Sequence, residues 1–82
     1  MAGGARGGRD GGTQKRSLTI QGHRTSISLE PIFWAALKQA AQEEGLSLAA
    51  LVADIDEART TALSSAIRVW LFERARRNSH QT

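Results

Sequence analysis

The sequence has no cysteine, so no disulfide can stabilise its fold. Its two histidines, His23 and His80, lie far apart in the chain and belong to no Cys/His cluster of the kind that holds a structural metal. A domain of about 60 residues buries only about 60% of the surface that its unfolded chain exposes, and it is marginally stable alone. We therefore expect no metal and no cofactor, and we expect a second copy of the chain to enlarge the core.

Long apolar runs and catalytic motifs are also missing. No run approaches the roughly 20 residues of a membrane-spanning helix, and the charged N-terminal segment lacks the apolar stretch of a secretory signal. Ser64 and Ser65 stand in no G-x-S-x-G motif. Asp54, Asp56 and Glu57 have neither histidine ligands nor calcium-loop spacing, and are typical of a solvated helix face. We expect a soluble cytoplasmic protein that is not an enzyme and has no membrane partner.

Glycine is concentrated at the N-terminal end. Six of the eight glycines fall in the first twelve residues, among Arg6, Arg9 and Asp10. Such a stretch has little apolar surface to offset a backbone ordering entropy of roughly 1–2 kcal/mol per residue. We therefore expect a disordered tail over residues 1–14 and a folded domain over 15–77. The last residues, 78–82, are expected to fray.

The net charge of +3 is distributed in three blocks along the chain. Residues 1–24 carry a net charge of +4, residues 25–58 carry −5, and residues 59–82 carry +4. Two basic ends around an acidic middle indicate a polyanionic partner that meets one part of the surface. A merely solubilising tail is the alternative explanation of the same pattern.

Polar and apolar residues alternate in the segment that follows the glycine-rich end, which predicts β-strand. The apolar residues are even-numbered at Leu18 and Ile20 but odd-numbered at Ile27 and Leu29. One regular strand cannot place both pairs on the same face, and Gly22 is the natural position for a turn or bulge between them. We expect either two short strands or one kinked ribbon.

Three apolar patterns with helical spacing follow the strand segment. The first begins at Pro31, a residue favoured at the first helical position, and ends at Gly45. Ser47 is placed to cap the second helix, and Thr61 or Ser64 to cap the third. The apolar residues expected in the core of a dimer are Ile27, Leu29, Phe33, Leu37, Leu51, Val52, Ile55, Ile67 and Trp70.

Two features indicate dimerisation. An isolated strand leaves both edges unpaired, and antiparallel pairing with a second copy would build a two-stranded ribbon of the kind that fits a DNA major groove. Val69 and Phe72 also widen the apolar arc of the third helix beyond what a monomer needs. The predicted fold is mostly α, with one short intermolecular antiparallel β ribbon and an additional C-terminal helix.

These segments resemble a known family. The string Thr25-Ser26-Ile27-Ser28-Leu29-Glu30-Pro31, then a helix, then Gly45-Leu46-Ser47-Leu48, is similar to the ribbon-helix-helix DNA-binding family of the MetJ/Arc type. Gly22-His23-Arg24-Thr25-Ser26 with Phe33-Trp34 resembles a bacterial subfamily sometimes labelled arylsulfate sulfotransferase-like. The resemblance covers roughly Lys15 to Arg76. Sulfotransferase activity itself would need a sulfate-donor site, for which the chain has no motif.

The resemblance implies double-stranded DNA as the partner. Arg24, Ser26 and Ser28 then point outward and read bases, since arginine can donate two hydrogen bonds to guanine. The helix that begins after Ser47 offers free backbone N–H groups to a phosphate, although Ala49 stands where many family members have a second Ser or Thr. The residues expected to contact phosphates are Lys15, Arg16, Ser47 and Leu48.

Two functions remain open from the sequence. The first is a homodimeric transcriptional regulator, a repressor associated with the nucleoid. The second is a protein-interaction or antitoxin-like module with little DNA affinity, which would hold a protein partner through its third helix. A basic ribbon surface favours the first and a neutral or acidic one the second. A higher oligomer stays open, as does the role of His23, which can fill a turn, contact DNA or sense pH.

Overall fold

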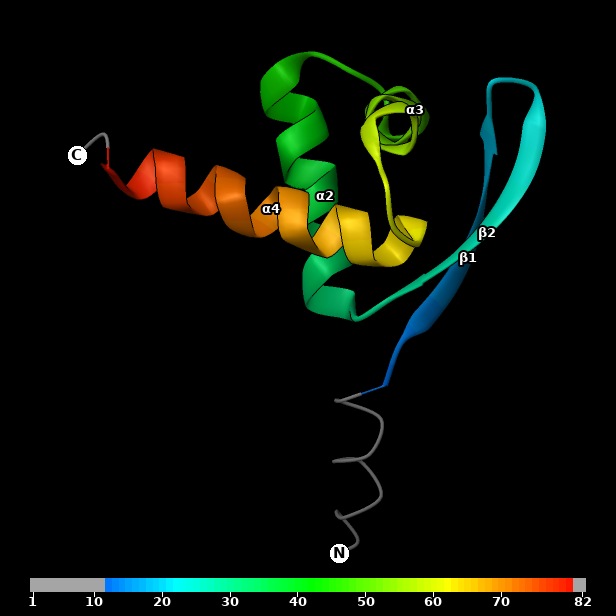
Figure 1. Cartoon of the computed structure of the whole chain (residues 1–82), viewed down its shortest axis with the longest axis horizontal. Helices are drawn as coiled ribbons and strands as arrows, with labels where there is room; N and C mark the ends of the chain where they lie inside the picture. The colour runs from blue at the N-terminus through cyan, green and yellow to red at the C-terminus, as the bar shows by residue number, and fades with distance from the viewer. Residues whose placement is uncertain (1–11, 81–82) are drawn as a thin grey trace, which may run out of the picture.

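A computed structural model describes residues 12–80, in which a β-hairpin is followed by three helices (Figure 1). The strands are β1, Gln14–Ile20, and β2, His23–Leu29. The helices are α2, Pro31–Glu44, then α3, Leu48–Ala58, and α4, Leu63–His80. The prediction of a mostly α fold with one short ribbon and an additional C-terminal helix is confirmed.

The ends of the folded region differ slightly from the expected boundaries. Residues 1–11 of the expected tail lie outside the described residues, and β1 already begins at Gln14. At the other end, α4 ends at His80, and the expected fraying of residues 78–82 stays a prediction.

The hairpin turn consists of Gln21 and Gly22, because Ile20 pairs directly with His23. Both turn residues have positive φ, 51° at Gln21 and 83° at Gly22. Two central residues with positive φ are the requirement of a type I′ turn, whose twist matches that of the flanking strands. A turn rather than a bulge therefore produces the change of phase seen in the sequence.

The two strands of this ribbon come from one chain, whereas we expected them to come from two copies. The turn allows the chain to fold back, so β1 occupies an edge of β2 that we expected a second copy to fill. The sheet order is β1–β2, which leaves the other edge of β2 open. The unpaired strand therefore no longer argues by itself for a dimer.

One chain also forms a core of its own. The helices pack on the inner face of the hairpin and bury apolar side chains from both strands and all three helices. Of the nine residues expected in a dimer core, seven are buried within the single chain, and Phe33 and Trp70 are partly buried against it. These side chains need no second copy to leave water. The seven are Ile27, Leu29, Leu37, Leu51, Val52, Ile55 and Ile67.

Trp34 ties α2 to the start of the hairpin. Its side chain is 3% exposed, and its indole Nε1 donates a hydrogen bond of 2.7 Å to the backbone oxygen of Gln14. The guanidinium of Arg16 lies 5.3 Å from the centre of the same ring, within cation–π distance. Both contacts hold β1 against the helices.

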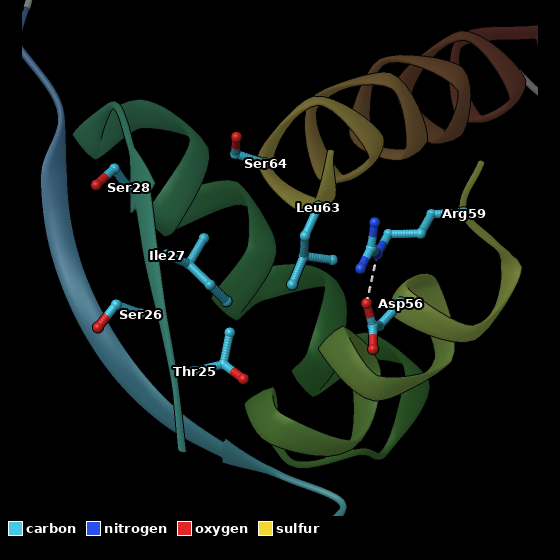
Figure 2. A pocket seen from close by; sticks show the side chains of 8 residues that line it. All are labelled: Thr25, Ser26, Ile27, Ser28, Asp56, Arg59, Leu63 and Ser64. Carbon is cyan, nitrogen blue, oxygen red and sulfur yellow. Dashed lines mark hydrogen bonds and ion pairs between the residues drawn. The ribbon is translucent and has the colours of Figure 1, made fainter. Parts of the chain in front are cut away.

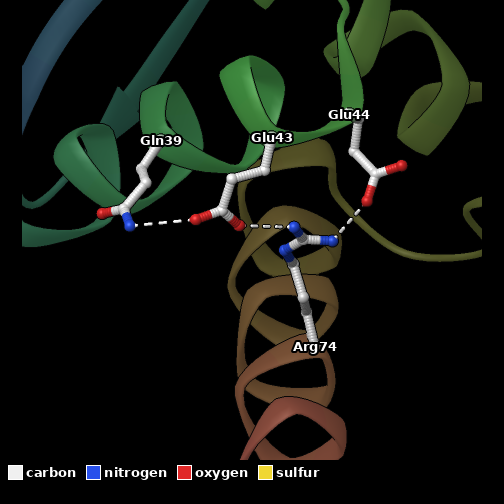
Figure 3. Close-up of polar contacts among 4 residues, drawn as sticks. All are labelled: Gln39, Glu43, Glu44 and Arg74. Carbon is white, nitrogen blue, oxygen red and sulfur yellow. Dashed lines mark hydrogen bonds and ion pairs between the residues drawn. The ribbon is translucent and has the colours of Figure 1, made fainter.

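Ion pairs between distant residues fix α4 on α2. Arg68 Nε lies 3.0 Å from Glu30 Oε1, at the start of α2. Arg74 donates to both Glu43 and Glu44 at the end of α2, over 2.7 and 2.6 Å (Figure 3). The hydrogen bond from Arg74, followed by one from Gln39, lowers the pKa of Glu43. The Arg74 side chain is only 15% exposed, so its ion pairs with the two glutamates are partly shielded from solvent.

Replacing Gly22 with alanine is expected to destabilise the hairpin by about 1–2 kcal/mol, because an L residue is strained at this positive φ. A Cβ there would meet no atom within 4 Å, so the cost is conformational rather than steric. Urea denaturation measures the loss. Gly45→Ala is the matched control, since Gly45 has a φ of 71° and equal space but ends α2.

Both variants should lose similar free energy of unfolding, but only Gly22→Ala should speed amide hydrogen exchange along β1 and β2. Unchanged stability and exchange in Gly22→Ala would contradict the type I′ turn.

Candidate nucleic-acid interface

The outer face of the hairpin is polar and basic. The odd-numbered residues of β2, among them Ile27 and Leu29, face the helices, so the even-numbered residues face outward. Residues directly opposite each other in an antiparallel pair lie on the same face of the sheet. The register therefore defines the outer face of the hairpin, which consists of Lys15, Ser17, Thr19, Arg24, Ser26 and Ser28.

This face has positive charge and no acidic side chain. Lys15 pairs with Ser28 at the open end of the hairpin, and Arg24 pairs with Thr19 near the turn, so the two charges lie at opposite ends. Between them Ser17 Oγ and Ser26 Oγ lie 3.5 Å apart. Five of the six residues are exposed, and Ser28 is partly buried. A two-stranded ribbon of this kind can enter a DNA major groove, where Arg, Ser and Thr side chains hydrogen-bond to base edges.

Ser17 and Thr19 were missed by the reasoning from sequence. We assigned base reading only to outward-facing residues of β2, because we expected the neighbouring strand of the ribbon to come from another copy. The signal was present, since Leu18 and Ile20 point inward and their neighbours must then point outward. The strand pairing within the chain brings both sets together.

The four expected phosphate contacts are divided among different places. Lys15 lies on the outer face, whereas Arg16 lies on the inner face with its guanidinium over Trp34. Ser47 caps α3, its Oγ accepting the backbone N–H of Ala50 over 3.0 Å, as predicted for a cap. Leu48 is the first residue of α3, so its backbone N–H is one of the donors left free at the helix start.

A groove follows the open edge of β2 (Figure 2). Four consecutive residues of β2 line it and no residue of β1 does, so it runs along the edge that β1 leaves free. In Figure 2 the side chains of Thr25 and Ile27 point toward the helices and those of Ser26 and Ser28 point away. The opposite wall comes from α3, α4 and the loop between them, and the groove has a volume of about 300 Å³. An extended strand is the element that such an edge pairs with.

The other acidic and histidine side chains that the structure describes are engaged singly or stand alone. Asp56 makes an ion pair with Arg59, and Glu57 accepts a hydrogen bond of 3.1 Å from Gln21. His23 is exposed at the first position of β2. No three His, Asp or Glu side chains of the described part of the chain gather as metal ligands would. Among residues 12–80 no helix has the length and apolar character to cross a membrane.

A β ribbon with a polar outer face and helices packed on its inner face defines the ribbon-helix-helix class of fold. The chain belongs to the ribbon-helix-helix domain family, whose model matches residues 13–75. The resemblance to the ribbon-helix-helix family is thereby confirmed, and the narrower resemblance to one bacterial subfamily stays a prediction. The family is one of DNA-binding and regulatory domains.

A solved structure has a similar fold. It is that of an uncharacterized protein from Bordetella pertussis Tohama I, at 24% sequence identity and a TM-score of 0.73. The alignment covers 90% of this chain, which spans 64% of the length of that structure. The likeness supports the fold assignment alone. No curated protein matches the chain.

Proposed function

We propose that this protein binds double-stranded DNA as a homodimer and represses transcription in the bacterial cytoplasm, at the nucleoid. The observation that carries the proposal is the outer face, which has two basic, four hydroxyl-bearing and no acidic side chains on a ribbon that fits the major groove. Base edges offer the acceptors that Arg24 needs, and phosphates offer the charge that Lys15 needs.

The second copy adds its β2 to the open edge of β2, in antiparallel orientation. The two β2 strands then lie side by side at the centre of the sheet, and each β1 lies at a flank. In this arrangement Arg24, Ser26 and Ser28 face the base edges, and Lys15 on the flank faces the phosphates that border the groove. The stacking of Arg16 on Trp34 favours a structural role for Arg16, so it is not part of this proposal.

The start of α3 adds a second phosphate contact. The Ser47 side chain already accepts a bond from Ala50, so the donors available to a phosphate are the backbone N–H groups at Leu48 and Ala49. Positive potential from the helix dipole favours the same anion.

An antitoxin-like protein module is the alternative function, and an apolar surface between α2 and α4 is the observation that favours it. The packing of α4 counts against an antitoxin whose C-terminal segment folds only on its toxin. Ile67 and Leu71 are buried in the core of their own chain, and Arg74 is held by two glutamates. The basic outer face also favours DNA over a protein partner.

Binding to a short random-sequence DNA duplex tests the proposal, measured by fluorescence anisotropy over a range of salt concentrations. The logarithm of the binding constant should fall linearly with the logarithm of the salt concentration. Lys15→Ala should make this slope shallower by about 0.9 for each phosphate that Lys15 neutralises. Lys38→Ala is the matched control, because Lys38 is an exposed lysine on α2 outside the outer face.

The control should keep the wild-type slope. Absence of duplex binding at low salt would overturn the proposed function, and equal effects of the two lysine variants would place the DNA elsewhere on the surface.

A further inference from the structure

Apolar side chains that residues 12–80 leave uncovered gather between α2 and α4. The described residues include four exposed large apolar side chains, and three of them line one groove of about 590 Å³. Ile32 is 74% exposed, Val69 56% and Phe72 63%. Scattered exposed apolar residues are ordinary, but a contiguous patch marks an interface. We call this surface, with its rim of Arg68, Glu73 and Arg76, the α2–α4 face.

The rim of the face carries both signs of charge. Arg68 is paired with Glu30, and the Arg76 guanidinium lies 5.9 Å from the centre of the Phe72 ring. Glu73 makes no ion pair with another described side chain. A nucleic acid or an acidic peptide is a poor occupant, because it would meet an apolar floor and a carboxylate.

We propose that the α2–α4 face docks against the same face of a second copy, with the two α4 helices antiparallel about a two-fold axis. A two-fold contact uses one patch twice, so a patch is its own partner when its apolar centre and its rim charges are self-complementary. The rotation brings Phe72 and Val69 of each copy onto those of the other. It also brings each Glu73 to a rim that carries Arg76.

The last turns of α4 support the same arrangement. In Figure 1 they extend past α2, away from the rest of the molecule. Residues 75–78 are all exposed, so these turns have little support within the chain. Isolated helical turns are marginal in water, and an adjacent α4 of a second copy supplies the missing packing.

This interface is separate from the DNA-binding proposal. The outer face lies on one side of the hairpin and the helices lie on the other, so both surfaces can be occupied together. The α2–α4 face is also distinct from the open edge of β2, which is lined by Thr25 to Ser28. In a ribbon dimer it adds a second two-fold contact, which closes at four copies when the two α2–α4 faces of one dimer meet those of another.

The mass of the protein in solution tests the proposal, measured by sedimentation velocity over a concentration series without DNA. Phe72→Ser and Ile32→Ser should each halve the limiting mass of the wild type. Leu46→Ser is the control, because Leu46 is the fourth exposed large apolar residue and lies outside the face, between α2 and α3. It should leave the mass unchanged. A monomeric wild type, or equal masses in all variants, would overturn the proposal.

Charge exchange gives an independent measurement that leaves the apolar side chains intact. Glu73→Arg and Arg76→Glu should each weaken self-association, and the double variant should restore it. A double variant as weak as the single variants overturns the two-fold arrangement. Circular dichroism checks the helix content of every variant. If a serine variant loses its helices, the charge variants alone test self-association through the α2–α4 face.

Discussion

Trp34→Ala is expected to lower the free energy of unfolding by about 3–5 kcal/mol, the range for removing a buried tryptophan. A chain of this size has about 4–12 kcal/mol in total, so the variant loses a large fraction of its stability. The physical reason has two parts. The substitution leaves a cavity between α2 and the hairpin, and it leaves the Gln14 carbonyl without its indole donor. Urea denaturation measures the change.

Trp34→Phe separates the two parts. Phenylalanine keeps most of the ring volume but has no N–H, so it should cost about 1 kcal/mol for the hydrogen bond plus a smaller packing loss. Trp70→Ala is a second control, because Trp70 is only partly buried and packs at the edge of the core. A Trp34→Ala variant no less stable than Trp70→Ala would contradict the role of Trp34 as the link between β1 and α2.

Arg24→Ala is expected to raise the Kd for a preferred duplex by roughly 10- to 100-fold, since a bidentate arginine–guanine pair contributes about 1–3 kcal/mol of discrimination. This result depends on the proposed DNA binding. The duplex is obtained by selecting tight binders from a random pool with the wild-type protein. The affinity for unselected duplexes should fall much less, because those complexes depend on phosphate contacts.

Arg77→Ala is the matched control for the loss of one arginine charge, since Arg77 is exposed on α4 and lies outside the outer face. It should change the affinity for selected and for unselected duplexes only by the small effect of the lower net charge. A variant Arg24→Ala that weakens selected and unselected duplexes alike would show that Arg24 contacts phosphate rather than bases.

Local signals in the sequence predicted most of the elements correctly. Pro31 begins α2, Gly45 ends it with a φ of 71°, and the Ser47 side chain caps α3. Each of these is decided by the conformational preference of one residue, which the sequence displays directly. The apolar spacing likewise identified the residues that became buried.

These local signals did not predict that β1 and β2 of one chain pair with each other. The sequences that indicate a two-residue hairpin turn are Asn-Gly and Asp-Gly, whereas this turn has Gln21 at positive φ before Gly22. Alternation along β1 places Arg16 on the same face as Leu18 and Ile20, but its contact with Trp34 depends on how α2 packs against the hairpin, which local spacing does not encode. The ion pairs of Arg68 and Arg74 join residues 30 or more positions apart, which no local spacing encodes.

The position of β1 beside β2 also bears on how the protein avoids aggregation. A strand edge with unpaired backbone groups can recruit further strands without limit, and natural sheets block such growth with charged residues at the edge. When two copies pair through β2, the sheet ends on both sides in β1, with Lys15 and Arg16 beside each other. Strand addition therefore stops at two copies, and the sheet stays finite at high concentration.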